Sequence, residues 1–415
     1  MTAFFFNVTD APYNAVGNGI ADDTAAIQDA IDDASVNGGM VVFPPGTYAV
    51  TSLAVTPGAN GSRGVQLRGA NYMASTIKRI ANSSGGGVML DISAHSVQLN
   101  DLRFEDYVYN GVNPSPLVRF VNVNDYDVDR CWFFGAETLL QCYFGDQSHI
   151  HACIFEGSRR HGLHFWGSGN ARVIGNVFYR NGNLSVNDPN AGAIKIEPVS
   201  GHAAPSNYTI TGNYFVFSQL AHFIQATTAV GIAITGNFFR LAGIFNENAF
   251  DEINLDDCDR VTIASNVSTE GGDPITPVAR VSRWIVKIAS TCTRVRIGDN
   301  SFEPGMSGTI SDAAADTYIS ASIDGNGPRK TLNASQTWTP PLLNAGTGTS
   351  VTVTVTGARV EDTAAVTYTG LGPGALALTA NVSANDTVNV VLFNGSPFAY
   401  QGPAGDLHVT VWKKA

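Results

Sequence analysis

The feature that most constrains this chain is a repeated phrase of alternating apolar residues. Each copy ends on a small residue or asparagine, usually followed within two positions by an aromatic residue. The phrase recurs eight times between residues 95 and 302. Its equivalent positions are Leu102, Cys131, Cys153, Asn176, Asn213, Asn237, Asn266 and Asn300. Their spacing falls to 22 residues and rises to 37. A constant minimum spacing, to which some repeats add further residues, is typical of a solenoid whose coils carry loops at their corners.

The five asparagines of the repeat predict a ladder along one corner of the solenoid. Stacked amides can hydrogen-bond along the axis, and asparagine tolerates the left-handed backbone that a tight corner needs. Cys131 and Cys153 occupy the same position in earlier coils, so we interpret them as ladder residues and expect no metal there. The five cysteines form no C-x-x-C pair, and an odd number without a secretion signal predicts buried, reduced thiols.

The charge pattern limits the partners of the chain. Charged residues make up 14% of it and the formal net charge is −11, with no basic run longer than Arg159-Arg160. Neither nucleic acid nor an anionic membrane is therefore an expected partner. The chain has no run of 18 apolar residues, and its first residues lack the pattern of a signal peptide. We expect synthesis in a cytoplasm and, for action outside the cell, release by lysis or without a cleaved signal.

Residues 7–48 predict a helix followed by a short buried strand. Asp22 to Thr24 supply an N-cap and an acidic first turn, and Gly38-Gly39 ends the helix. The narrow apolar face of this helix consists of Ile27, Ala30, Ile31 and Ala34. Residues 40–43 form the strand, and a Pro-Pro-Gly turn follows it. Such a helix is expected to cover the open end of a stack of strands.

This block resembles the opening of the pectate-lyase-like (pectin-lyase-fold) superfamily, in the helix start at residues 22–31 and the Phe-Pro-Pro-Gly-Thr-Tyr turn at residues 43–48. The resemblance implies an all-β fold, a right-handed single-stranded parallel β-helix with an N-terminal capping helix. The superfamily contains lyases, glycoside hydrolases, epimerases and phage tailspikes. The resemblance therefore leaves the chemistry open.

The end of the repeat after Phe302 predicts a second domain. We divide the chain into an N-terminal segment with the capping helix (1–39), the parallel β-helix (40–305), a linker (306–335) and a C-terminal β-sandwich (336–415). The last part consists of short alternating segments between Gly/Pro turns. It resembles the C-terminal modules of phage tail fibres and spikes, which implies trimerisation or sugar binding.

A second strand precedes the repeat phrase in each coil, and alternation identifies its outward residues. They predict a polar and aromatic stripe along the axis, suited to a linear glycan, and the substrate of pectate lyases and tailspikes also runs along this flank. The residues that we assign to substrate binding are Arg119, Arg160, His164, Trp166, Lys195, Glu252, Asn254 and Lys287. The alternative is that outward positions are polar in any β-helix.

Glu197 and Asp256 are the candidate catalytic pair. Two coils would separate them by on the order of 9–10 Å, near the upper end for an inverting glycosidase. The acidic run at residues 251–257 could instead bind Ca²⁺, the one cofactor considered, or be a solvated corner. The tight local motifs of pectate lyases and the Asp-Asp arrangement of polygalacturonases are absent, which counts against both activities.

Three functions fit this pattern. The first is a spike or fibre protein of a phage-like particle that recognises host-surface polysaccharide, capsular or exopolysaccharide, along the β-helix flank and could depolymerise it. The second is a free polysaccharide lyase or inverting glycoside hydrolase, and the third is a structural trimeric fibre without glycan activity.

The missing signal peptide favours the first function. Its expected partners are an extended polysaccharide, further copies in a homotrimer, and an adaptor or particle protein near the N-terminus. The expected location is the virion or the extracellular space. Whether the chain is an enzyme stays open.

Overall fold

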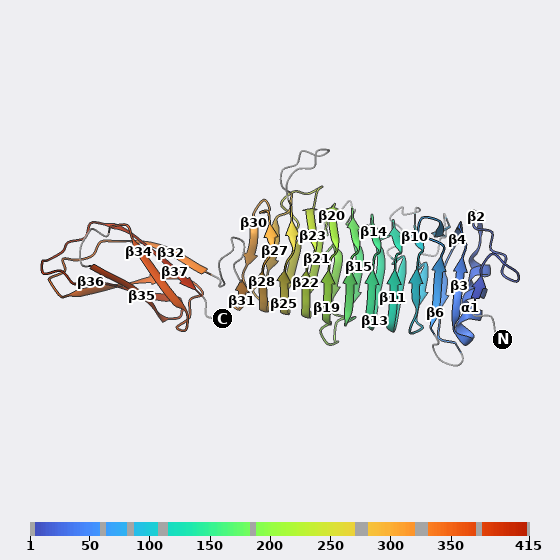
Figure 1. Cartoon of the computed structure of the whole chain (residues 1–415), viewed down its shortest axis with the longest axis horizontal. Coiled ribbons are helices and arrows are strands. Elements are labelled where there is room, and N and C mark those ends of the chain that lie inside the picture. Colours follow the sequence, from blue (N-terminus) through green and yellow to red (C-terminus); the bar gives the residue numbers. More distant parts are fainter. Residues whose placement is uncertain are drawn as a thin grey trace. The chain divides into compact units, whose positions relative to one another are not determined.

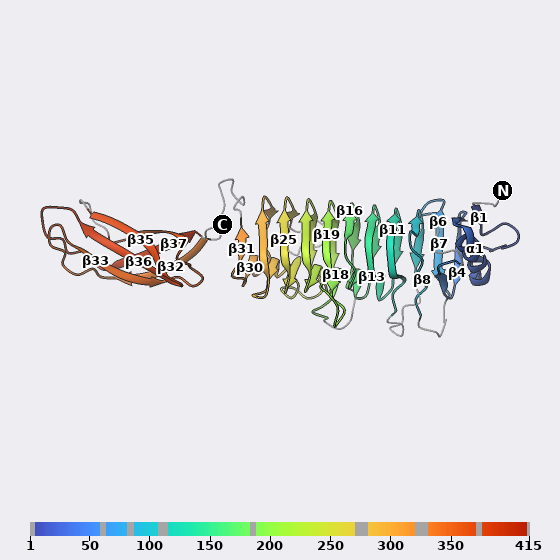
Figure 2. The same cartoon turned by 90° about the horizontal axis from the view of Figure 1, so that it is seen from below.

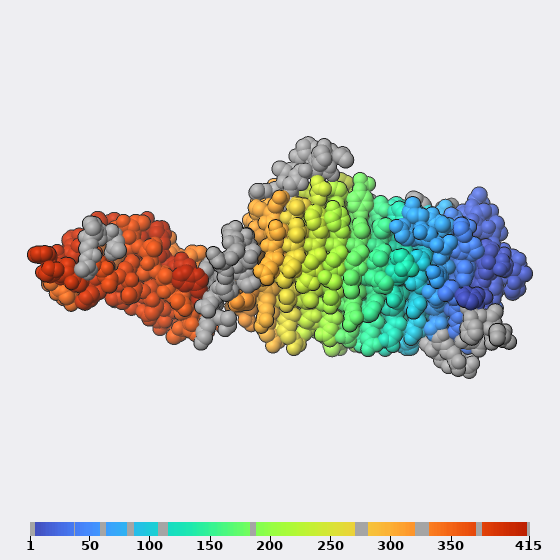
Figure 3. Space-filling model, viewed as in Figure 1, coloured from blue at the N-terminus to red at the C-terminus, as the bar shows by residue number. Residues whose placement is uncertain are grey.

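The computed structural model describes residues 5–58, 64–80, 87–106, 115–182, 188–269, 281–319, 331–370 and 376–412. The chain divides into two compact units, Met1–Asp316 and Thr317–Ala415. The first unit is a right-handed parallel β-helix, and Figures 1 and 2 show its successive coils side by side. In the space-filling view these coils are closely packed bands (Figure 3).

The strands of the first unit form three faces. The first face contains β1 (Phe5–Asn7), β3 (Gly39–Phe43), β6 (Val65–Gly69), β9 (Gln98–Asn100), β11 (Val118–Asp129), β13 (Thr138–His151), β16 (Ala171–Ile174), β19 (Ser206–Thr211), β22 (Val230–Thr235), β25 (Asp259–Ala264) and β28 (Thr293–Gly298). The second face contains β5 (Leu53–Val55), β8 (Leu90–Ile92), the first halves of β11 and β13, β15 (His161–Trp166), β18 (Gly192–Glu197), β21 (His222–Thr227), β24 (Ile253–Asp256), β27 (Trp284–Ile288) and β30 (Gly308–Asp312).

The third face is the narrowest. It contains β2 (Asn18–Asp22), β4 (Gly46–Val50), β7 (Ser75–Arg79), β10 (Arg103–Glu105), β12 (Trp132–Phe134), β14 (Ile154–Glu156), β17 (Val177–Tyr179), β20 (Tyr214–Ser218), β23 (Phe238–Ala242), β26 (Val267–Ser268) and β29 (Ser301–Phe302). Its inward side chains form one column of stacked rings. They are Phe104, Phe133, Phe155, Phe178, Phe215 and Phe239. The strand spacing holds neighbouring rings at stacking distance, which gives the core its regularity.

The asparagine ladder is present at the corner before the third face. Each amide nitrogen donates to the amide oxygen of the next coil, at 3.0 Å from Asn176 to Asn213 and 2.9 Å from Asn266 to Asn300. Cys131 and Cys153 extend the ladder, since the backbone N–H of Cys131 donates to the Cys153 sulfur at 3.4 Å. One expected detail was wrong, because the left-handed residue precedes each asparagine. These residues are Gly175, Gly212, Gly236, Ser265 and Asp299.

The capping helix is α1 (Thr24–Asn37), which packs against β1, β3 and β5. The four residues of its predicted apolar face are fully buried, and Gly38 ends the helix at φ 75°. The N-cap residue is Asp23, inside the predicted range, but its side chain does not cap the helix, and the first turn contains no acidic residue, contrary to the prediction. The Asp23 carboxylate accepts the backbone N–H groups of Val16 at 2.6 Å and Gly17 at 3.2 Å and makes no capping bond. It is buried, and it fixes the preceding turn.

Parallel pairing continues further along the chain than expected. β30 lies inside the segment 306–335 that was expected as a linker, and it pairs with β27. The sequence there lacks the aromatic phrase of the repeat, so its periodicity gave no signal. Residues 320–330 of the expected linker lie outside the described part of the chain.

The second unit is a β-sandwich. After β31 (Thr317–Ile319) its two antiparallel sheets are β32 (Thr331–Trp338), β37 (Gly405–Trp412) and β34 (Thr363–Tyr368), and β33 (Gly348–Thr354), β36 (Thr387–Asn394) and β35 (Leu376–Ala384). Its core includes Val388, Val390 and Val409, all buried. No helix in the described ranges is long and apolar enough to cross a membrane.

Candidate functional site

Nine side chains on the second face form one in-register row through successive coils. The row is Asp91, Arg119, Gln141, His164, Lys195, Gln225, Asn254, Lys287 and Ser311. Five of them were expected from the sequence to bind substrate. Parallel strands in register place equivalent residues one strand spacing apart, so the row runs along the solenoid axis.

The middle of this row is buried. His164, Lys195 and Gln225 are 6%, 2% and 5% exposed, whereas Arg119 and Lys287 nearer the ends are partly exposed. Alternation placed these residues on the outward side of the sheet but could not show that other parts of the chain cover them. Direct contact of His164 or Lys195 with a polymer on the surface is therefore restricted.

The buried residues hold one carboxylate in place. The Gln141 amide donates to His164 Nδ1 at 3.1 Å, which leaves the imidazole proton on Nε2. His164 Nε2 donates to Glu197 Oε1 at 2.9 Å, and Lys195 Nζ lies 3.4 Å from Glu197 Oε2. Glu197 is partly exposed, so the network ends in a carboxylate that solvent or a ligand can reach.

The electrostatics of the network keep Glu197 ionised. Burial lowers the pKa of His164 and of Lys195. The negative charge of Glu197 raises both pKa values but does not offset the effect of burial. Burial raises the pKa of Glu197, but the hydrogen bond and the charge of His164, followed by the charge and the hydrogen bond of Lys195, outweigh it and bring that pKa to about 2. At neutral pH the lowered pKa of His164 leaves the imidazole an uncharged donor, and Lys195 is then the cation next to the carboxylate.

An exposed row lies beside the buried one. Tyr143, Trp166 and Glu197 are in register, and Trp166 is 37% exposed. The Tyr143 ring contacts the Trp166 ring edge to face, with centroids 5.0 Å apart. The row of outward residues continues on the next two strands with Thr227 and Asp256. The accessible surface thus combines aromatic rings with a fixed carboxylate.

The sequence prediction missed Gln141 and Tyr143. Both lie in β13, a 14-residue strand that runs through the corner between two faces, so it did not stand out as a separate strand before the repeat phrase. Alternation applied to residues 138–143 would have identified them.

Glu197 and Asp256 lie on the same exposed row, two coils apart by strand register. Two strand spacings correspond to about 9–10 Å. Asp256 is exposed and accepts a hydrogen bond from Thr291 Oγ1 at 3.0 Å. The pair could flank a bound glycan, but an ionised Glu197 is unsuited to donate a proton to a leaving group.

Glu252 is buried where an outward position was expected, whereas Arg160 is at the surface. Glu252 is 0% exposed and lies before β24 begins at Ile253, so outward alternation does not extend to it. A direct sugar contact by Glu252 is therefore incorrect for this structure. Arg160 is exposed, and its Nε donates to Asp188 at 2.7 Å.

The acidic run at residues 251–257 does not converge on one point. Asp251 is fully buried and binds Arg283 through both carboxylate oxygens, at 2.8 and 2.6 Å. Asp256 and Asp257, at the other end of the run, accept hydrogen bonds from threonines. These carboxylates are thus engaged separately, and within the described ranges no group of three or more acidic, histidine or cysteine side chains is placed to hold a metal ion.

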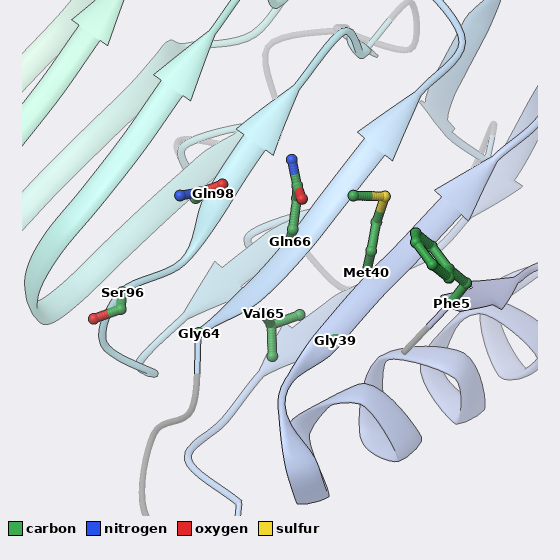
Figure 4. Close-up of a pocket in the computed structure, with 8 residues that line it drawn as sticks. All are labelled: Phe5, Gly39, Met40, Gly64, Val65, Gln66, Ser96 and Gln98. Carbon is green, nitrogen blue, oxygen red and sulfur yellow. The ribbon is translucent and has the colours of Figure 1, made fainter. Parts of the chain in front are cut away.

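A depression of about 320 Å³ lies elsewhere, on the outer surface of the first face near α1 (Figure 4). The figure shows Phe5, Met40, Gln66 and Gln98 projecting from neighbouring strands. The remaining lining residues are Gly39, Gly64, Val65 and Ser96. None of the residues predicted for substrate binding lines it.

The fold is that of the pectate-lyase-like class of β-helix proteins. Residues 5–266 match the family described as rhamnogalacturonase A/epimerase, pectate lyase-like. The chain belongs to this family.

Solved structures with the same fold include phage tailspikes. The enzymatically active domain of bacteriophage CBA120 tailspike protein 2 is 14% identical with a TM-score of 0.56, covering 99% of this chain and 73% of that one. The full-length tailspike protein 2 from the Escherichia coli O157:H7 bacteriophage has a TM-score of 0.55 at 14% identity, over 97% of this chain and 63% of that one. The Dettilon tailspike protein has 13% identity and a TM-score of 0.50, over 98% and 94% of the two chains. At such identities the likeness shows the fold.

A curated relative matches a short segment. Plasmin and fibronectin-binding protein A of Streptococcus pneumoniae is 58% identical over 43 residues, which cover 10% of this chain and 6% of that protein.

Proposed function

We propose that this chain recognises an extended polysaccharide along the exposed row of its second face. The observation that supports this most is the fixed, ionised carboxylate of Glu197 beside the exposed Trp166 ring. A charged carboxylate accepts hydrogen bonds from sugar hydroxyls, and an aromatic ring packs on the apolar face of a sugar ring. Because the row continues through several coils, a linear polymer can follow it.

Recognition fits this geometry better than cleavage does. Hydrolysis needs a carboxylic acid with a raised pKa, whereas the pKa of Glu197 is lowered to about 2. Depolymerisation is the second candidate, since groups with shifted pKa values cluster at the partly exposed Glu197. In that reaction the Glu197–Asp256 pair would flank the polymer, and the buried His164 and Lys195 would hold Glu197 in place.

We further propose that the chain acts as a spike of a phage-like particle, located in the virion, with a host-surface polysaccharide as its target. The tailspike names of proteins with the same fold support this proposal. An adaptor or particle protein near the N-terminus would hold the spike. A free carbohydrate-active enzyme outside the cell and a structural fibre without glycan activity are the competing functions.

A binding and degradation assay tests the proposal. The purified full chain is incubated with pectate, alginate, xanthan, dextran and purified bacterial capsules, and binding and polymer length are both measured. We expect one polysaccharide to bind, and Trp166→Ala to weaken its binding about tenfold or more, a loss of about 1.4 kcal/mol.

Phe5→Ala is the control, since Phe5 is exposed on a different face. It should leave the affinity unchanged. Equal affinity of the Trp166→Ala variant and the unchanged chain would contradict the site, and failure to bind any glycan would contradict the function. Shortened polymer chains would favour depolymerisation over recognition alone.

A further inference from the structure

The exposed row of the second face carries negative charge. Its members from β13 to β24 are Tyr143, Trp166, Glu197, Thr227 and Asp256. Two of these side chains are carboxylates, and none is a cation. Glu197 and Asp256 lie two coils apart, about 9–10 Å along the axis. A linear polymer that follows the exposed row therefore passes both carboxylates.

Two cations of the neighbouring, largely buried row are already neutralised by carboxylates of the same chain. Arg119 donates to both carboxylate oxygens of Asp91, at 3.0 and 2.7 Å. Lys195 is 2% exposed, and its Nζ lies 3.4 Å from Glu197. Since each of them balances a carboxylate of the chain, neither is available to balance an acidic group of a ligand.

Two further cations lie at the margins of the exposed row. Arg160 precedes β15, and its Nε donates to Asp188 at 2.7 Å. Lys287 is partly exposed and is in register with Asn254 of the preceding coil, so it lies beyond the last carboxylate of the row, Asp256. A single amine at one end leaves the length of the exposed row without a positive charge.

The charge of Glu197 persists wherever an acidic sugar is itself charged. Against the opposing effect of burial, His164 and Lys195 hold the pKa of Glu197 at about 2. The formal net charge of −11 adds repulsion at long range. An acidic group about 5 Å from such a carboxylate at a protein surface would weaken binding about tenfold.

Hydrogen bonding gives the same preference as charge. An ionised carboxylate only accepts hydrogen bonds, and the hydroxyl and amide N–H groups of sugars donate them. An ionised acidic substituent is also only an acceptor, so it would leave Glu197 or Asp256 without a donor. Trp166, 37% exposed, adds an apolar surface on which a sugar ring packs without any charge.

We propose that the polysaccharide recognised by the exposed row is built from sugars without acidic groups. This inference rests on the proposed function and specifies its substrate class. Polymers of uronic acids, and polymers with sulfate, phosphate or pyruvate substituents, are then discriminated against by the two carboxylates that otherwise bind hydroxyl groups.

Matched pairs of polymers test the substrate class with the full chain. Pectate, alginate and xanthan are compared with the same polymers after reduction of their carboxyl groups to alcohols, and with dextran and galactomannan. Binding is measured in low salt at about pH 8, above the ordinary pKa of histidine, so that imidazoles add no positive charge. We expect binding among the polymers without acidic groups, and any reduced polymer that binds should do so about tenfold more tightly than its parent.

Two variants identify the source of the discrimination. Asp256→Asn removes one charge of the exposed row and should decrease the difference between parent and reduced polymer to about threefold. Asp29→Asn removes the same charge from an exposed position on α1, several coils away, and should leave the difference unchanged. An equal response to both substitutions would overturn the proposal, because the charge of the row would then not set the preference.

The outcomes separate this inference from the proposed function. An acidic polymer that binds more tightly than its reduced form, and loses its affinity in Trp166→Ala, would overturn the substrate class and leave recognition at the exposed row intact. If none of the polymers and none of the bacterial capsules binds, the proposed function fails and the substrate class with it.

Discussion

Glu197 shows how neighbouring coils determine the state of a single side chain. His164 belongs to the preceding coil and Lys195 to the same strand, and both are buried behind the carboxylate that they bind. A buried ion pair is stable only when further hydrogen bonds satisfy its members, and here Gln141 supplies one to the imidazole. The consequence is a carboxylate with a fixed position and a fixed charge at the surface.

Acid sensitivity follows from the lowered pKa of Glu197. A carboxyl group whose pKa is lower in the folded state than in the unfolded state stabilises the protein at every pH above its unfolded pKa. That stability is lost as pH falls from the ordinary value of 4.5 toward about 2. The full shift corresponds to about 3 kcal/mol, and partial exposure reduces this to about 1–2 kcal/mol. We expect Glu197→Gln to cost this amount at pH 7 and to remove that part of the acid destabilisation.

Urea unfolding of the two proteins between pH 2.5 and 7 measures the difference. Glu247→Gln, an exposed carboxylate elsewhere in the first unit, is the control and should follow the unmodified chain. If the Glu197→Gln and unmodified curves stay parallel down to pH 2.5, Glu197 is not held ionised by the network.

At the scale of elements, each coil depends on its two neighbours. Asn237 illustrates this, because its amide donates to Asn266 Oδ1 at 3.0 Å and to the Ile210 carbonyl at 2.9 Å, and its oxygen accepts the backbone N–H of Asn213. An interior ladder residue thus connects three coils. Asn300, the last asparagine of the ladder, accepts from Asn266 and donates to the Ile263 carbonyl at 2.9 Å, so these bonds connect two coils.

Alanine substitutions should therefore differ with position in the ladder. Asn237→Ala leaves the buried Ile210 carbonyl and Asn213 N–H without partners, which costs about 3 kcal/mol. Asn300→Ala leaves the Ile263 carbonyl and the Asn266 N–H without these partners in the same way, but it breaks no bond to a further ladder amide, so it should cost about 1 kcal/mol less. Chemical denaturation of both variants gives the comparison. Equal losses at the two positions would contradict the idea that the interior of the ladder couples three coils.

At the scale of the whole molecule, the chain consists of two units with separate cores. The first unit is built from parallel coils, and the second has a core of its own with Val388 and Val390 fully buried. Units with independent cores can unfold independently. The second unit therefore need not be folded for the second face of the first unit to bind a ligand.

Calorimetry should resolve two transitions in the full chain. Val388→Asp places a charge in the core of the second unit, and we expect it to abolish one transition and leave the other, together with any glycan binding, unchanged. Thr387→Asp, at the neighbouring and more exposed position of β36, serves as the matched control. A loss of both transitions in Val388→Asp would mean that the units fold as one.

The sequence by itself determined the coils, the capping helix and the asparagine ladder. In a solenoid, residues separated by one coil are neighbours in space, so a repeat such as Asn213, Asn237 and Asn266 directly encodes a contact. The helix at residues 24–37 was likewise readable, because its apolar face and its terminal glycines are local signals. The pectate-lyase-like family, confirmed for residues 5–266, follows from the same local block.

Only the tertiary structure decided which outward residues are accessible. Alternation gives the side of a strand, but burial depends on what other coils and loops lie over that side. Alternation therefore could not distinguish the buried His164 and Lys195 from the exposed Trp166, nor show that Glu252 is fully buried. The row of outward apolar side chains on the third face becomes visible only once strand register aligns Tyr214 with Phe238. A single outward apolar residue is ordinary, and only a row of them on neighbouring strands forms an apolar surface.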